Sequence, residues 1–137
     1  MLKIILSSIL FVSLISCDSF TAKNPTDKDL MGKTWVLTNI GNRPTQKGVE
    51  VTLVFDNETE LSGFAGCNYY NSDYSLSGEN FSVWGITSST DSCSETIMDQ
   101  EANFIITFEG AESIKLYGDN LVINSNEIYR KLKFSKR

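Results

Sequence analysis

The sequence contains no histidine, and this absence removes several classes of enzyme. A Ser-His-Asp triad, a Cys-His pair and any metal site with histidine ligands all require an imidazole. The 137-residue chain also lacks a glycine-rich phosphate loop, because Gly63 and Gly66 precede a cysteine and a predicted strand where nucleotide-binding motifs precede a helix. We interpret this glycine pair as a bulge or tight turn. We therefore expect no metal, no organic cofactor and no catalytic residues.

An excess of positive charge is also missing. The chain has 12 Lys and Arg against 17 Asp and Glu, which gives a formal net charge of -5. Binding to a phosphate backbone needs a basic surface that neutralises several phosphates. The acidic balance argues against a nucleic-acid partner, and the length favours one small, monomeric domain.

No hydrophobic run reaches the roughly 20 residues that span a bilayer. The main apolar stretch, residues 4–14, follows Lys3 and leads into Leu14-Ile15-Ser16-Cys17. A short apolar run after an early cation is typical of a secretory signal, and a cysteine at the expected cleavage point indicates a bacterial lipobox. We predict cleavage before Cys17 and lipidation of Cys17, which would anchor the protein to a membrane of the cell envelope. The alternative is an ordinary signal peptide with an incidental cysteine.

The three cysteines are consistent with export. If Cys17 carries lipid, Cys67 and Cys93 remain, and an oxidising compartment favours a bond between them. The alternative is a pair of buried free thiols. The predicted organisation is a signal peptide at 1–16, the lipidated cysteine with a flexible tether at 17–29, and one domain at 30–137.

Short alternating runs of β-branched and aromatic residues follow residue 30, which is typical of antiparallel strands. The runs predict strands at 34–40, 51–55, 60–64, 68–76, 80–83, 113–117, 121–124 and 128–134. Turn residues such as those at 118–120 and 125–126 separate neighbouring strands.

Residues 94–109 differ, because Ile97, Glu101, Phe104, Ile105 and Phe108 recur at helical spacing. A capping box from Ser92 to Glu95 and a left-handed Gly110 would bound this helix. Its apolar stripe needs a partner surface, so we expect an α+β fold in which a curled antiparallel β-sheet packs around or against one main α-helix.

Strict alternation in the strand at 68–76 places Tyr70 and Tyr74 on one face and Tyr69 with Asp73 on the other. The first face is predicted to be core. Tyr69, on the polar face, is a candidate interaction residue of the kind that is enriched in protein interfaces. The alternative is a scattered surface aromatic without a partner.

The block Gly63-Phe64-Ala65-Gly66-Cys67-Asn68, followed by Tyr74, Cys93 and Glu101, resembles the META domain family. That family includes the HslJ-like heat-shock lipoproteins. The segment Leu30-x-Gly32-x-x-Trp35-x-Leu37 resembles the family's opening strand. The chain departs from the family's pattern at Tyr69, where arginine is frequent, at Ser72, where glycine is common, and at 89–92.

The resemblance implies an α+β fold, paired cysteines, and family motif residues at Gly63, Gly66, Asn68, Tyr74 and Glu101. It implies no defined molecular activity. Members of the family are associated with stress tolerance, antibiotic resistance, and virulence or motility.

Three functions from different classes are consistent with these observations. We favour a non-enzymatic, membrane-anchored envelope lipoprotein that binds other envelope components in stress or antibiotic tolerance. The first alternative is a small-ligand-binding module that uses the concave face of the sheet. The second is a carboxylate-dependent hydrolase, because two facing acids suffice for glycoside hydrolysis. Its candidate pairs are Asp73 with Glu79 and Asp91 with Glu95.

Overall fold

The structure is a computed structural model that describes residues 21–137, so the predicted signal peptide and Cys17 lie outside the described residues. Within the described range, two helices and nine strands follow one another along the chain. In chain order they are α1 (Asp27–Leu30), β1 (Thr34–Ile40), β2 (Arg43–Pro44), β3 (Thr52–Phe55), β4 (Glu60–Phe64), β5 (Tyr69–Ser77), β6 (Asn80–Ser88), α2 (Glu95–Glu109), β7 (Ala111–Tyr117), β8 (Asn120–Ser125) and β9 (Lys131–Lys136).

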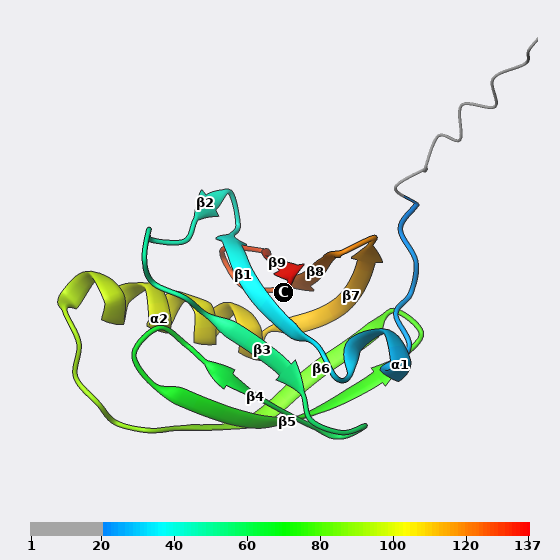
Figure 1. The fold of residues 1–137 in the computed structure, drawn as a ribbon, viewed down its shortest axis with the longest axis horizontal. Helices are drawn as coiled ribbons and strands as arrows, with labels where there is room; N and C mark the ends of the chain where they lie inside the picture. The colour runs from blue at the N-terminus through cyan, green and yellow to red at the C-terminus, as the bar shows by residue number, and fades with distance from the viewer. Residues whose placement is uncertain (1–20) are drawn as a thin grey trace, which may run out of the picture.

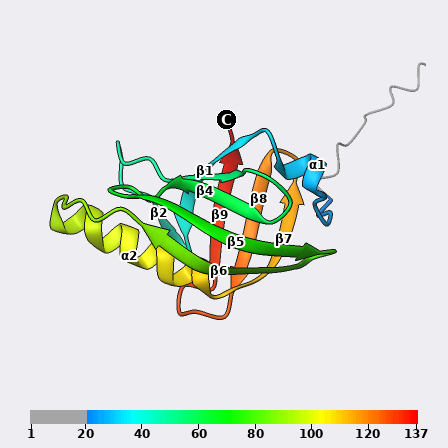
Figure 2. The same ribbon diagram turned by 90° about the horizontal axis from the view of Figure 1, so that it is seen from below.

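The sheet closes on itself. The strand order is β2-β1-β3-β4-β5-β6-β7-β8-β9, and β1 also pairs with β9. The closing pairs include Leu37 with Phe134 and Ile40 with Leu132. All strands but β2 therefore form one antiparallel ring, which Figures 1 and 2 show from two sides.

This closure corrects the predicted fold class. We expected an α+β fold with an open, curled sheet packed on a main helix, and the structure is a mostly β, closed barrel. Closure removes the two free sheet edges, which would otherwise present unpaired backbone groups. The prediction of antiparallel pairing is confirmed at every strand contact around the ring.

Alternation along the strands fills the barrel with apolar side chains, because successive residues point to opposite faces. In β5 the odd-numbered positions are exposed, whereas Tyr70, Ser72 and Tyr74 are buried. The largest fully buried side chains are Trp35, Phe55, Tyr74, Phe81, Phe104, Phe108 and Phe134.

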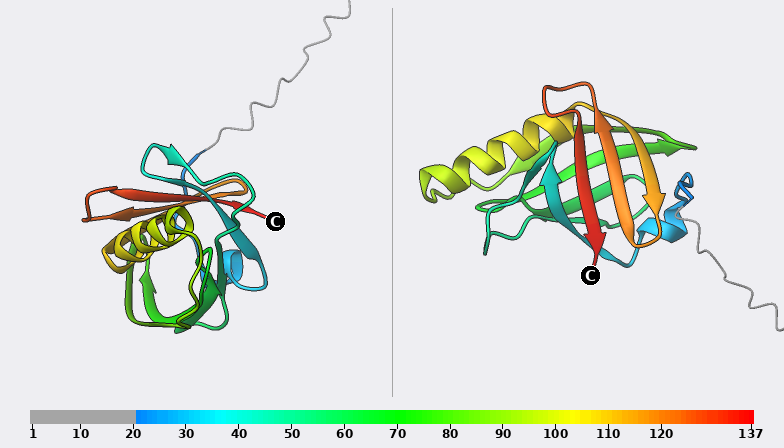
Figure 3. Two further views of the ribbon diagram at one scale, coloured as in Figure 1. Left: turned by 90° about the vertical axis from the view of Figure 1, so that its left-hand side faces the viewer. Right: turned by 90° about the horizontal axis from the view of Figure 1, so that it is seen from above.

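Helix α2 lies across one end of the barrel, beside the ends of β1, β8 and β9, as the right-hand view of Figure 3 shows. Its apolar stripe inserts Phe104 and Phe108, which are both fully buried. The helix therefore caps the core and is not the layer on which the sheet packs. Among the described residues, no helix is both long and apolar enough to cross a membrane.

The predicted extent of this helix, 94–109, is confirmed within one residue, but both predicted caps are wrong. The N-cap is Ser94, two residues after the predicted Ser92, and its side chain makes no capping hydrogen bond. Gly110 has φ -85°, so it is not left-handed. A Cβ there would lie 2.5 Å from Asn126 Oδ1 and 2.7 Å from Ser125 Oγ, so any larger residue would displace these side chains.

The segment predicted as a tether is shorter than expected. Lys23 exchanges two backbone hydrogen bonds of 2.9 Å with Leu116, and Pro25 is buried. Asp29 accepts hydrogen bonds from the Thr26 backbone N–H and hydroxyl, which stabilises the start of α1. Residues from Lys23 onward thus pack on the barrel rather than forming a free linker.

The last strand also begins later than predicted. It runs from Lys131, and Ile128 is 81% exposed in the loop before it. Arg130 has a positive φ of 63°, which turns the chain into β9. The apolar residues at 128 and 129 resembled strand residues, but the turn that starts at Ser125 extends through them.

Candidate functional site

A disulfide joins Cys67 to Cys93, with the two Cα atoms 5.9 Å apart. Cys67 lies in the turn between β4 and β5, and Cys93 lies just before α2. The bond therefore connects the start of β5 to the start of the helix across 26 positions of sequence. A closed loop of this size stabilises a small domain by about 3–4 kcal/mol in the chain-entropy model.

Glu101 is the centre of a buried polar network next to this disulfide. Its carboxylate accepts hydrogen bonds from the backbone N–H groups of Cys67 at 2.9 Å and Asn68 at 2.7 Å. It accepts a third from Asn68 Nδ2 at 2.6 Å. Glu101 is only 8% exposed, and a buried carboxylate is stable only where several donors replace its water.

Asn68 continues the network to the loop before the helix. Its Oδ1 accepts hydrogen bonds from the Asp91 backbone N–H at 2.7 Å and the Ser89 hydroxyl at 3.1 Å. One side chain thus connects α2, the start of β5 and the 89–93 loop. The family motif residues Asn68 and Glu101 form a structural connection at this end of the barrel.

The two motif glycines allow the close packing at this end. A Cβ on Gly63 would lie 2.0 Å from the Thr52 carbonyl oxygen and 2.7 Å from Tyr70 Oη, so no other residue fits without backbone movement. Gly66 has φ +113° in the turn that leads to Cys67, a conformation that favours glycine. Neither glycine precedes a helix, so the pair has no phosphate-loop geometry.

The order of these features along the chain matches one family. The sequence profile of the META domain covers residues 28–137. The chain belongs to the META domain family. No curated protein matches it significantly.

Two solved structures resemble this META domain. One is a protein determined by NMR, which has a TM-score of 0.66 at 15% identity and covers 81% of this chain and 94% of its own. The other is a protein from Burkholderia xenovorans, also determined by NMR, which has a TM-score of 0.64 at 18% identity and covers 80% of this chain and 85% of its own. At these identities the likeness establishes the fold alone.

The outer face of the META domain carries an unusual group of aromatic side chains. Tyr69 is 71% exposed and Trp84 is 50% exposed. The ring of Phe64, on β4, lies 4.9 Å from the ring of Tyr69, centroid to centroid. We call Phe64 and Tyr69 the aromatic face; Trp84 lies opposite Asp73, four residues farther along β5. Tyr69 also lines two shallow depressions of about 310 and 430 Å3, one on each side.

Acidic side chains lie beside the aromatic face. Asp56, Glu60 and Asp73 line a third depression, and Asn71 lines this depression and both of those at Tyr69. Within residues 21–137, no cluster of three His, Cys, Asp or Glu side chains could hold a metal ion. These acids form a negatively charged rim beside the aromatic face.

The acids proposed for a hydrolase lie on separate elements. Asp73 is in the middle of β5, whereas Glu79 lies in the turn after it and forms a 2.5 Å ion pair with Lys115. Asp91 and Glu95 are both exposed, and neither lines a depression described above. Neither pair has the enclosed, facing geometry that glycoside hydrolysis requires.

The barrel interior is occupied by packed rings rather than by a cavity. Tyr70 contacts Phe104 and Phe108 at centroid distances of 5.5 and 6.0 Å, and Phe81 lies 6.5 Å from Phe108. The helix thus fills the concave face that a small ligand would need.

The predicted bond between Cys67 and Cys93 is confirmed. The sequence also singled out Asn68 and Glu101 but did not predict the hydrogen bonds that join them. Glu101 and Asn68 are 33 positions apart, and no local spacing pattern reports such a contact. One signal was available in the sequence: Glu101 lies within the apolar stripe of the predicted helix. A buried carboxylate in such a stripe needs hydrogen-bond donors from another part of the chain.

Proposed function

We propose that the mature protein is a non-enzymatic envelope lipoprotein, anchored through lipid on Cys17, which binds another envelope protein through the aromatic face. Three features support this proposal: membership of the META domain family, the Cys67–Cys93 bond expected for an exported protein, and the exposure of Tyr69. The exposure of Tyr69 carries the proposal of partner binding.

Exposed aromatic side chains leave a large apolar area in contact with water, so the pair formed by Phe64 and Tyr69 is suited to burial against another surface. The Tyr69 ring lies against the ring of Phe64 in a tilted contact, which restricts its motion before any partner arrives. A restricted ring loses less conformational entropy on binding. Tyr69 is therefore the proposed central anchor of the interface.

The charge next to the aromatic face favours a particular kind of partner. The acidic rim formed by Asp56, Glu60 and Asp73 complements a protein surface that carries Lys or Arg around an apolar patch. We propose a basic envelope protein as the partner and stress or antibiotic tolerance as the setting of this interaction. The two alternatives lack support, because the concave face is filled and the candidate acids lie apart.

The test is site-specific photo-crosslinking in intact cells that produce the full chain. A photoreactive phenylalanine at position 69 should give a discrete crosslinked product. The matched control is the same probe at Ser75, an exposed outward position on the same strand. Equal products at both positions, or no product at position 69, would refute the interface.

The substitution Cys17→Ser in the same experiment separates the anchor from the interface. If both parts of the proposal hold, Cys17→Ser should abolish membrane association and greatly reduce the crosslink from position 69. A crosslink of undiminished yield from soluble protein would reject the anchor and leave the interface standing.

A further inference from the structure

The segment before α1 is fastened to one end of the barrel. Lys23 exchanges two backbone hydrogen bonds with Leu116 on β7, and its Nζ forms a 2.7 Å ion pair with Asp29. Asn24 Oδ1 accepts a 2.7 Å hydrogen bond from Lys115 Nζ. The chain therefore becomes part of the folded domain at Lys23.

This docking leaves only a short connection to the proposed lipid anchor. Residues 18–22 separate Cys17 from Lys23. A fully extended chain spans at most about 3.6 Å per residue, so Lys23 cannot be farther than roughly 22 Å from the lipidated residue. The end of the barrel that carries Lys23 is thus the end that a lipid on Cys17 would hold near the bilayer.

Strand β5 leads from this end of the barrel to the aromatic face. The turn after β5 contains Gly78, where a Cβ would lie 4.0 Å from Asn24 Nδ2. The strand begins at Tyr69, next to the Asn68 backbone N–H that Glu101 of α2 binds. Its nine residues measure about 27 Å, and a tilt of about 35–45°, usual in barrels, leaves about 20 Å along the axis. Tyr69 therefore lies about 20 Å beyond the attachment point.

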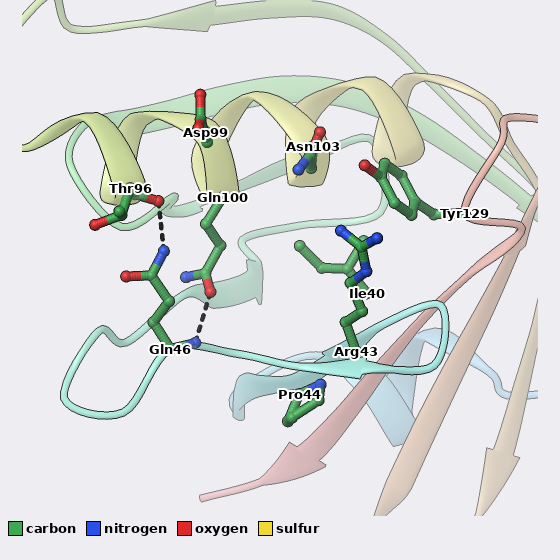
Figure 4. Close-up of a pocket in the computed structure, with 9 residues that line it drawn as sticks. All are labelled: Ile40, Arg43, Pro44, Gln46, Thr96, Asp99, Gln100, Asn103 and Tyr129. Atoms are coloured by element: carbon green, nitrogen blue, oxygen red, sulfur yellow. Dashed lines mark hydrogen bonds between the residues drawn. The ribbon is translucent and has the colours of Figure 1, made fainter.

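The far end is rigidly joined to the rest of the barrel. Figures 1 and 2 show α1 at one end of the molecule and α2 at the other. The loop after β2 holds α2 through Gln46, whose backbone N–H donates to Gln100 Oε1 at 2.7 Å and whose Nε2 donates to the Thr96 carbonyl, as Figure 4 shows. The Cys67–Cys93 disulfide adds a covalent connection. A constraint at the α1 end therefore sets the direction of the α2 end as well.

The exposed large apolar side chains lie away from the attachment end. In the described range they are Tyr69, Trp84, Ile106 and Ile128. Ile106 is on α2, Trp84 is in the middle of β6, and Ile128 follows Asn126, whose N–H donates to the carbonyl of Gly110 at the end of α2. The α1 end thus offers little apolar surface for insertion into lipid, whereas the opposite end offers apolar surface for contact with a protein.

A short tether alone would allow the domain to lie on its side, with the wall that carries Tyr69 against the bilayer. The acidic rim opposes this arrangement. Glu60 and Asp73 are direct neighbours across β4 and β5, and neither belongs to the four ion pairs among the described residues. The negative surface potential of an anionic bilayer repels such a wall.

We propose that the docked N-terminal segment orients the anchored domain, with its α1 end toward the bilayer and the aromatic face toward the aqueous space. The proposal rests on the lipid anchor at Cys17 proposed above. The partner of the aromatic face is then a protein whose basic surface lies about 20–40 Å from the bilayer, and not the lipid itself. A soluble envelope protein or the water-exposed domain of a membrane protein meets this requirement.

The test is energy transfer from the protein to a labelled bilayer. The lipidated full chain is purified from membranes and reconstituted into vesicles of phosphatidylethanolamine and phosphatidylglycerol that carry a rhodamine-labelled headgroup. A donor dye is attached through an azide-bearing amino acid at position 28 in α1 or at position 95 in α2, where Lys28 and Glu95 are both exposed. Transfer should be larger from position 28, and position 95 should lie about 20 Å farther from the bilayer.

The substitution Lys23→Pro tests whether docking causes the orientation. It removes the N–H that donates to the Leu116 carbonyl and the ammonium that pairs with Asp29. The Leu116 amide should exchange faster with solvent, and the difference between positions 28 and 95 should decrease, because the freed residues lengthen the flexible connection. The matched control is Ala22→Pro, one residue earlier and outside the bonded pair, which should retain the difference.

The outcomes separate the orientation from the anchor. A mature chain that carries no lipid and stays off the vesicles refutes the anchor, and the orientation with it. A lipidated chain in which position 95 is as near to the bilayer as position 28, or nearer, refutes the orientation alone. A photoreactive residue at position 69 that crosslinks to lipid also refutes it, as does an undiminished difference in Lys23→Pro despite faster exchange at Leu116.

Discussion

The two faces of strand β5 use the same type of residue for opposite purposes. Tyr70 and Tyr74 point into the barrel and are 2% and 1% exposed, whereas Tyr69 points outward and is 71% exposed. The inner tyrosines pair their hydroxyls with backbone carbonyls, Tyr70 with Thr52 at 2.8 Å and Tyr74 with Asn57 at 2.7 Å. Tyr69 has a ring contact with Phe64 and lines open depressions.

This difference separates the side chains that stabilise the barrel from the one proposed to bind a partner. Inward aromatic rings contribute apolar burial and edge-to-face contacts, such as the 5.1 Å contact between Phe55 and Tyr74. An outward ring contributes little to folding, so Tyr69 is free to serve in the proposed interface. Substitutions that affect only one face can test this separation.

The largest effect is expected for Tyr74→Ala. The change removes a buried ring and leaves a cavity, so it should lower the free energy of unfolding by about 3–5 kcal/mol. The same substitution on the outer face, Tyr69→Ala, should change it by less than about 0.5 kcal/mol. Urea denaturation measures both. Similar losses for the two variants would break the comparison and place Tyr69 in a structural role.

A smaller effect is expected at the point where β5 begins. Glu101→Gln replaces one carboxylate oxygen with an NH2 group that faces either the two backbone donors or Asn68 Nδ2, and it should lower the free energy of unfolding by about 1–3 kcal/mol. Hydrogen exchange of the Cys67, Asn68 and Asp91 amides should accelerate. The matched control is Glu109→Gln, an exposed acid at the end of the same helix, which should leave both measurements unchanged. Unchanged exchange in Glu101→Gln would show that the network does not hold the loop.

The smallest effect concerns alkaline pH. Burial raises the pKa of the Tyr74 hydroxyl to about 12, and the negative charge of Asp27 adds to this shift. Burial also raises the pKa of Tyr70. Because the folded state holds these phenol protons more tightly than the unfolded state, the raised pKa stabilises the folded protein. This contribution is complete below pH 10, the ordinary tyrosine pKa, and is lost as the pH rises toward 12.

The check is urea denaturation between pH 9 and pH 12, a window set by these shifts. The stability of the unaltered chain should fall across it, and the fall should be smaller in the double variant Tyr70→Phe and Tyr74→Phe. If the double variant loses stability as steeply as the unaltered chain, the inner tyrosines do not cause the decline.

Much of the local structure followed from the sequence. Alternation predicted the inward and outward faces of β5, and helical spacing predicted α2 with its buried Phe104 and Phe108. The motif around Cys67 indicated the META domain family, and the family profile confirms it. These features depend on residues that are close together in the chain. Over such short distances, the spacing of apolar residues indicates directly which side chains are buried.

The sequence did not reveal how the sheet closes. The Thr38 hydroxyl bonds to the Lys133 carbonyl across 95 positions, and no local pattern shows that β1 and β9 are neighbours. For the same reason the docking of Lys23 on Leu116 was missed, and a polar segment with a proline was interpreted as a tether.

The sequence by itself determined the buried faces of β5 and α2, the antiparallel character of the strands, and the family to which the chain belongs. Only the tertiary structure decided that the sheet is a closed barrel and that Glu101 binds Asn68. The physical reason is that periodicity reflects the environment of each residue, whereas closure and site assembly depend on contacts between distant segments that are fixed only when the whole core packs.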